Sequence, residues 1–142
     1  MLTSTLPRFA GDMQANFVGE QAKAWSDARA DALIHILAPH DQGAPLHEVH
    51  GRITIERFRY MLPESWQRLA YPAILPNIRR SPVVAMLLPG FLLAQLKAAA
   101  RVARRKRVDL VYAHWIMPQG LVAWRLKRKL GIPYVLQNHS SD

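Results

Sequence analysis

The chain has 142 residues, half of them apolar, and a formal net charge of +9. This length suits one domain with a hydrophobic core and is too short for two. The absence of cysteine excludes a disulfide scaffold, a thiolate metal site and a cysteine nucleophile.

The amino terminus lacks the basic-then-apolar order of a signal peptide, so we expect a cytoplasmic protein. Residues 2–5 are typical of the end of a strand whose beginning is absent. The next loop contains Gly11 and Asp12, and we expect Asp12 to cap a helix over residues 13–27. A glycine in such a loop permits close backbone approach to a ligand, although an ordinary turn has the same pattern.

The run 32–38 is continuously apolar, as in a parallel strand buried on both faces. His35 lies inside this run, and we interpret it as a hydrogen-bonded core residue. His47 and His50 are three residues apart with no cluster of further ligands near them, so we predict no metal site. Residues 52–60 alternate as a short strand does.

Three prolines within residues 62–78 forbid one long helix there, and short helical turns fit residues 64–70 and 77–81. Residues 82–103 predict a long helix whose first part, 82–96, carries no charge. A spanning helix needs about 20 apolar residues. We therefore expect a buried crossover helix rather than a segment lying in a bilayer interface.

Residues 108–113 form a predicted strand that ends at His114 and Trp115, and a Pro-Gln-Gly turn leads into a helix over 121–130. A last strand is predicted over 132–137. Alternating strands and helices indicate an α/β fold, a Rossmann-like parallel sheet with helices on both faces. We expect this domain, residues 1–142, to be truncated at both ends. Ligands of such sheets bind at the carboxyl ends of strands, which makes His114 the first candidate for chemistry.

The excess positive charge lies in residues 97–129, whose only acidic residue is Asp109. Its members are Lys97, Arg101, Arg104, Arg105, Lys106, Arg107, Arg125, Lys127, Arg128 and Lys129. We call these ten residues the basic patch. It suits a surface that binds phosphates or anionic lipid, or else two solvated helix faces.

Several segments together resemble the N-terminal domain of family 4 glycosyltransferases, the retaining GT-B enzymes. The segments are residues 3–12 followed by Phe17 and Val18, then 109–120, and then 131–142 with its Gly-Ile-Pro and His-Ser-Ser-Asp sequences. Ser140 stands where the family often has glycine, which puts close backbone approach there in doubt.

The resemblance implies two Rossmann-like domains facing a cleft, of which the N-terminal one binds the acceptor and the C-terminal one the nucleotide sugar. It implies that His114 positions and polarises the substrate. Further substrate contacts would come from Gly11, Asp12, Trp115, Gln119, Gly120, His139, Ser140, Ser141 and Asp142. No metal or other cofactor is expected. The C-terminal domain with its paired glutamates is absent, so we expect this chain alone to be inactive.

The implied reaction transfers a sugar, of hexosyltransferase type, to a glycan, a lipid-linked or a small-molecule acceptor, as in polysaccharide biosynthesis. The basic patch would hold the enzyme peripherally on the inner face of an anionic membrane. The alternative is a non-catalytic basic module for nucleic acid or anionic membrane. Against nucleic acid, aromatic residues do not alternate with the basic ones, and no helix-turn-helix or zinc pattern occurs. A dinucleotide-binding domain is a third interpretation, but the first loop lacks the Gly-x-Gly-x-x-Gly motif of such domains.

Overall fold

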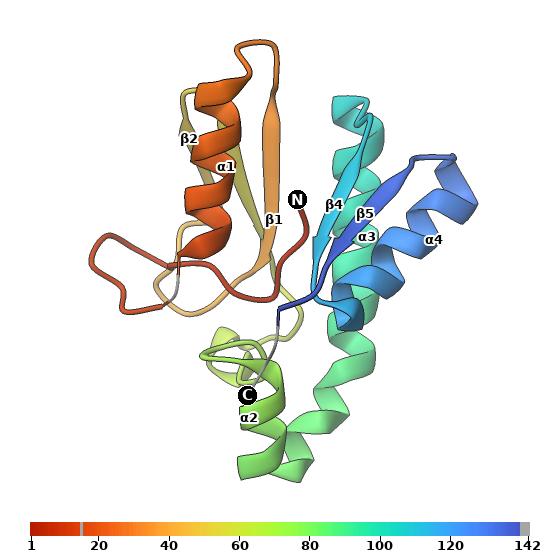
Figure 1. The fold of residues 1–142 in the computed structure, drawn as a ribbon. Helices are drawn as coiled ribbons and strands as arrows, with labels where there is room; N and C mark the ends of the chain where they lie inside the picture. The colour runs from red at the N-terminus through yellow and green to blue at the C-terminus, as the bar shows by residue number, and fades with distance from the viewer. Residues whose placement is uncertain (15, 140–142) are drawn as a thin grey trace.

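A computed structural model describes residues 1–14 and 16–139. Its strands are β1 (Ile34–Pro39), β2 (His47–His50), β3 (Ile53–Phe58), β4 (Val111–His114) and β5 (Tyr134–Gln137). Its α-helices are α1 (Phe17–Ala28), α2 (Ile74–Arg80), α3 (Leu88–Lys106) and α4 (Leu121–Leu130). Shorter helical turns are η1 (Glu64–Trp66), η2 (Pro82–Leu87) and η3 (Ile116–Gly120). The alternation of strands and helices is as the sequence predicts (Figure 1).

The strands pair in two groups, in the orders β2-β3-β1 and β4-β5. Leu2 joins the groups, because it forms parallel bridges to Leu37 of β1 and to Ala113 of β4. Strand β1 is parallel to β3, and β4 is parallel to β5, whereas β2 runs antiparallel to β3 at the edge. The predicted parallel sheet is therefore confirmed, with one antiparallel edge strand.

Helices cover both faces of this sheet (Figure 1). On one face Val18 and Ala22 of α1 pack with Ile36 of β1 in a small core. On the other face a larger core contains Phe91 from α3 and Leu126 from α4. A strand turns successive side chains to opposite faces, so β1 contributes to both cores, Leu37 to the larger one and Ile36 to the small one.

The start of α1 differs from the prediction. The helix begins at Phe17 and its N-cap is Asn16, so the prediction that Asp12 caps a helix over 13–27 is wrong. The Asp12 carboxylate instead accepts hydrogen bonds from the backbone N–H and the guanidinium of Arg8. The arginine four residues earlier binds both carboxylate oxygens with charged donors, an arrangement that adds geometric specificity to the energy of the ion pair.

The long helix also differs from the prediction. Turn η2 leads directly into α3, and Pro89 lies in the first turn of α3, where a proline is tolerated. Residues 72–90 include no buried residue, whereas six side chains of α3 are buried from Phe91 onward. The expected burial of the uncharged part, 82–96, is confirmed for Phe91 and Gln95 and is wrong for residues 82–90, which extend beyond the edge of the sheet (Figure 1).

The ring of Phe91 should be a main contributor to stability. It is fully buried and makes edge-to-face contacts with Phe58 and Tyr60, at centroid distances of 5.2 and 5.0 Å. We expect Phe91→Ala to lower the free energy of unfolding by about 3–5 kcal/mol in urea titrations. Leu93→Ala, an exposed position on the same helix, should change it by less than about 0.5 kcal/mol. Equal effects of the two substitutions would contradict this assignment of the core.

Candidate functional site

His114 is the last residue of β4 and is completely buried. Its backbone N–H donates to the Leu2 carbonyl at 3.0 Å, which holds it at the carboxyl edge of the sheet. Its ring atom Nδ1 lies 3.0 Å from Nε2 of His139, which follows β5. The other ring atom, Nε2, is buried and has no partner within the described residues. Buried polar atoms without a partner are rare in folded proteins, which makes this nitrogen a candidate for contact with a ligand group.

Aromatic side chains surround this histidine pair. The rings of His114 and His139 are nearly parallel, with an angle of 15° between their planes. Phe17, at the start of α1, contacts both, and its ring centroid lies 4.5 Å from that of His139. The indole of Trp115 lies 5.2 Å from His139 and 5.6 Å from Phe17. The structure thus brings together three predicted site residues, His114, Trp115 and His139.

Trp115 has an unusual backbone conformation, with φ 68° and ψ 145°. A bulky residue at positive φ is strained, and such residues concentrate at functional sites. Two hydrogen bonds hold it there: its N–H donates to the Gln137 carbonyl at 2.8 Å, and its carbonyl accepts from the Gly120 N–H at 3.2 Å. This conformation directs the indole toward the histidine pair. The sequence gives no signal for it.

Gln119 and Gly120 are buried beneath this turn. The side-chain amide of Gln119 makes two hydrogen bonds: its oxygen accepts from the Ser4 N–H at 2.9 Å, and its nitrogen donates to the His114 carbonyl at 3.2 Å. At Gly120 a Cβ atom would lie 3.0 Å from the Leu136 side chain, so glycine permits α4 to approach β5 closely. Their contacts are with the protein, and their roles in binding substrate stay predictions.

Gly11 and Asp12 lie in the loop that follows the Leu2 segment. Gly11 has φ +81°, which the turn requires, and nothing lies within 4 Å of where a side chain would begin. The carboxylate of Asp12 is bound by Arg8, whose guanidinium also donates to Asp41 at 2.8 Å. These donors hold the pKa of Asp12 well below its usual value. Within the described chain the polar contacts of the Asp12 carboxylate are with Arg8 and Gln14, so its predicted role toward substrate is untested.

Three further predicted site residues, Ser140, Ser141 and Asp142, lie outside the described residues. The structure adds a polar cluster that the sequence analysis missed. The Tyr112 hydroxyl donates to Oε1 of Gln137 at 2.6 Å, and Nε2 of Gln21 donates to the same oxygen at 3.1 Å. Tyr112 lies two residues before His114 in a strand, and Gln21 lies one helical turn after Phe17 in α1. The strand and helix periodicities therefore place Tyr112 and Gln21 on the same side as the site.

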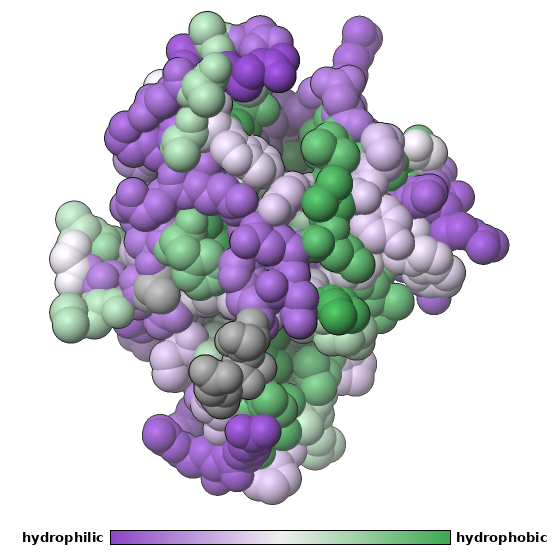
Figure 2. Space-filling view, in the orientation of Figure 1, coloured by the Kyte–Doolittle hydropathy of each residue, from purple (hydrophilic) through white to green (hydrophobic). Residues whose placement is uncertain are grey.

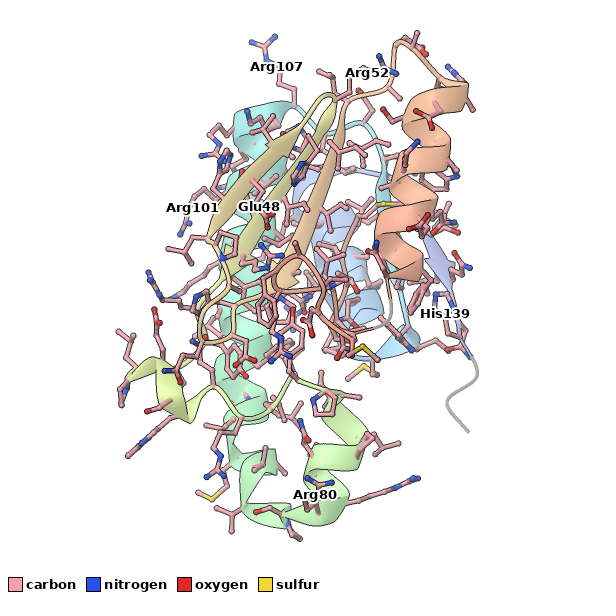
Figure 3. All side chains as sticks on the ribbon, turned by 90° about the vertical axis from the view of Figure 1, so that its left-hand side faces the viewer. Glu48, Arg52, Arg80, Arg101, Arg107 and His139 are labelled. Carbon is pink, nitrogen blue, oxygen red and sulfur yellow. The ribbon has the colours of Figure 1, made fainter. Side chains whose placement is uncertain are left out.

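The basic patch does not converge on this site. Six of its members lie in the last turns of α3 and α4, which lead into the amino ends of β4 and β5. His114 is at the opposite, carboxyl edge, and Figure 3 shows Arg107 at the far end of the molecule from Arg80, with His139 toward the Arg80 end. Cations in the last turn of a helix are favoured by its dipole. The solvated helix faces considered above therefore account for much of this charge.

A cavity of about 940 Å³ also lies at the amino edge, where Leu2, His35 and Tyr112 contribute to its lining. His114, Trp115 and His139 are not among the residues that line it. Within the described residues, no group of three His, Asp or Glu side chains is placed to hold a metal ion. The cavity is therefore separate from the His114–His139 pair.

Comparisons with known proteins agree on one family. The family model described as Glycosyltransferase Family 4 matches residues 14–142. An uncharacterized glycosyltransferase of Methanocaldococcus jannaschii is 26% identical over 113 residues, which cover 75% of this chain and 31% of that protein. The structure of a sucrose-phosphate synthase from Thermosynechococcus elongatus superposes with a TM-score of 0.57 and 17% identity, over 87% of this chain and 59% of that one. The chain thus spans less than two thirds of each relative, and the structural likeness shows a fold similar to the GT-B fold.

The protonation of His114 provides a test of its environment. Burial, with the adjacent His139 and the chain's amino group, lowers the pKa of His114 to about 4 from 6.5. Because the unfolded chain protonates first, folding stability should fall as the pH drops from 6.5 to about 4. The His114 ring should titrate near pH 4 by NMR, and His114→Gln should lose this part of the pH dependence. A titration midpoint near 6.5 would contradict the buried, neutral state.

The Arg8–Asp12 pair should stabilise the first loop. Asp12 is almost fully buried and accepts three hydrogen bonds from Arg8, so we expect Asp12→Ala to lower the free energy of unfolding by about 1–3 kcal/mol. The difference should shrink as the pH falls below 3.8, where the carboxyl of the unfolded chain becomes protonated. Asp27→Ala is the matched control, because its pair with Lys23 is exposed and should contribute little to stability. Equal losses in the two variants would refute the structural role.

Proposed function

Because this chain belongs to glycosyltransferase family 4, we propose that it forms the acceptor-side domain of an enzyme that transfers a sugar from a nucleotide-sugar donor to an acceptor hydroxyl with retention. The transferred group is a hexose, and the acceptor is a glycan, a lipid-linked sugar or a small molecule, as in cytoplasmic polysaccharide biosynthesis. A second domain binds the donor, so these 142 residues alone do not complete the transfer. No metal takes part.

The observation that carries this proposal is the unpartnered Nε2 of His114 at the carboxyl end of β4. A neutral imidazole has one donor and one acceptor nitrogen, and Nδ1 is occupied by His139. Nε2 can therefore accept from, or donate to, a sugar hydroxyl, depending on which tautomer the His139 contact selects. The low pKa of His114 keeps the imidazole neutral at physiological pH, which suits a hydroxyl better than a phosphate.

The surrounding rings support a sugar ligand. Phe17 meets His114 edge-on and Trp115 lies tilted against His139, so both rings present apolar surface next to the polar atoms of the pair. Sites for small molecules typically combine such surface with a few fixed polar groups. His139 fixes the His114 ring, and the strained Trp115 backbone fixes the indole. We assign His114 to positioning and polarising the hydroxyl, and the other two residues to the walls of the site.

Binding of acceptors can be measured by NMR on this chain. Oligosaccharide and lipid-linked acceptors should shift the ring resonances of His114 and His139 and the indole resonance of Trp115. His114→Ala should weaken that binding by about tenfold, the loss of roughly one hydrogen bond in a buried site. His50→Ala, which removes an exposed histidine of β2, should leave it unchanged. The proposal fails if no acceptor class shifts these resonances. It also fails if only nucleotide sugars bind there and His114→Ala leaves their affinity unchanged.

A further inference from the structure

Residues 72–90, comprising α2, η2 and the residues next to them, form an apolar projection beyond the sheet (Figure 1). None of these residues is buried. Its inner side chains, such as Ile74 and Leu87, pack partly on the larger core. Its outer side chains are exposed to solvent: Val83 is 71% and Met86 80% exposed. A contiguous apolar surface of this kind on a folded domain indicates a binding face.

The charges of the apolar projection have one sign. Arg79 and Arg80 end α2 and are exposed, and neither forms an ion pair within the described residues. No Asp or Glu occurs from residue 65 to residue 108. Figure 2 shows hydrophobic and hydrophilic residues side by side at this lower end of the molecule, and Figure 3 shows Arg80 there. Exposed apolar side chains can enter the bilayer interface, and arginines beside them can bind the phosphates of anionic lipids, so together they favour binding to an anionic lipid surface.

Helix α3, which follows the apolar projection, determines whether this part of the chain can cross a membrane or only contact its surface. By length and composition alone, Pro82–Lys106 could cross a membrane. Its second half, however, packs across the sheet through Ala98 and Val102 and carries the basic residues of α3. Within residues 82–106, the part before Phe91 has no buried side chain and can enter lipid, so the contact is with the interface of one leaflet and not a crossing.

We infer that residues 72–90 dock this domain on an anionic bilayer, with Val83 and Met86 entering the interface and Arg79 and Arg80 binding lipid phosphates. The apolar projection leads into the first turn of α3, at the carboxyl edge of the sheet where His114 also lies. The loop before α1 touches it, since Gln14 Nε2 donates to the Pro72 carbonyl at 3.0 Å. Docking therefore brings the site, rather than the basic patch, toward the membrane. This inference does not depend on the proposed transferase function.

Vesicle co-sedimentation tests the docking surface. The chain should sediment with vesicles of phosphatidylcholine and phosphatidylglycerol in equal amounts, and weakly with phosphatidylcholine alone. Val83→Asp with Met86→Asp should reduce binding by about tenfold or more, and Arg79→Glu with Arg80→Glu should do likewise. The matched control is Leu33→Asp with Val49→Asp, which changes two exposed apolar residues elsewhere. Thermal unfolding of each variant checks that the fold is kept.

A second measurement reports insertion directly. The chain has no cysteine, so Met86→Cys and Val49→Cys each accept a single environment-sensitive fluorophore. Emission at position 86 should shift to shorter wavelength with anionic vesicles, and emission at position 49 should not. Three results overturn the inference. The first is that the unaltered chain does not bind vesicles, and the second is that Arg104→Glu with Arg107→Glu abolishes binding while the Val83 and Met86 changes do not. The third is that light scattering without vesicles shows self-association through residues 72–90.

Discussion

Four backbone hydrogen bonds around Leu2 hold the sheet together. The N–H groups of Leu2 and Thr3 donate to Tyr112 and Leu37, and the carbonyls of Met1 and Leu2 accept from Leu37 and His114. Without them the structure separates into a three-stranded and a two-stranded group. Because one of these bonds ends on His114, the same contact that closes the sheet also fixes the backbone of the candidate site.

Much of the fold could be predicted from the sequence because hydrophobic periodicity and helix stop signals are local. Helix α4 begins and ends as predicted, since an apolar stripe is followed by Gly131, which adopts the left-handed conformation that ends the helix. The apolar run before His114 likewise predicts strand β4, and His114 is a candidate because ligands bind at the carboxyl ends of parallel strands. His139 is adjacent because β5 pairs in register beside β4.

Other features could not be predicted because they depend on partners distant in the sequence or on backbone geometry. Composition marks residues 82–90 as apolar but does not say how far protein covers them, and here none of them is fully buried. The position of Leu2 between two strands far apart in the chain has no local signal. The positive φ of Trp115 is equally invisible, since a tryptophan would not be expected there. For Asp12, a nearby arginine competed successfully with the expected helix cap.

The alternation of side chains along β4 has a consequence for how the site must fold. Val111 and Ala113 belong to the larger core, and Tyr112 and His114 meet the aromatic residues of α1. A slip of one residue in the pairing of this short strand would exchange the two sets and place the imidazole in the hydrophobic core. Strand register is therefore a condition for any chemistry at His114, and errors in it during folding would produce a chain with the right secondary structure and no site.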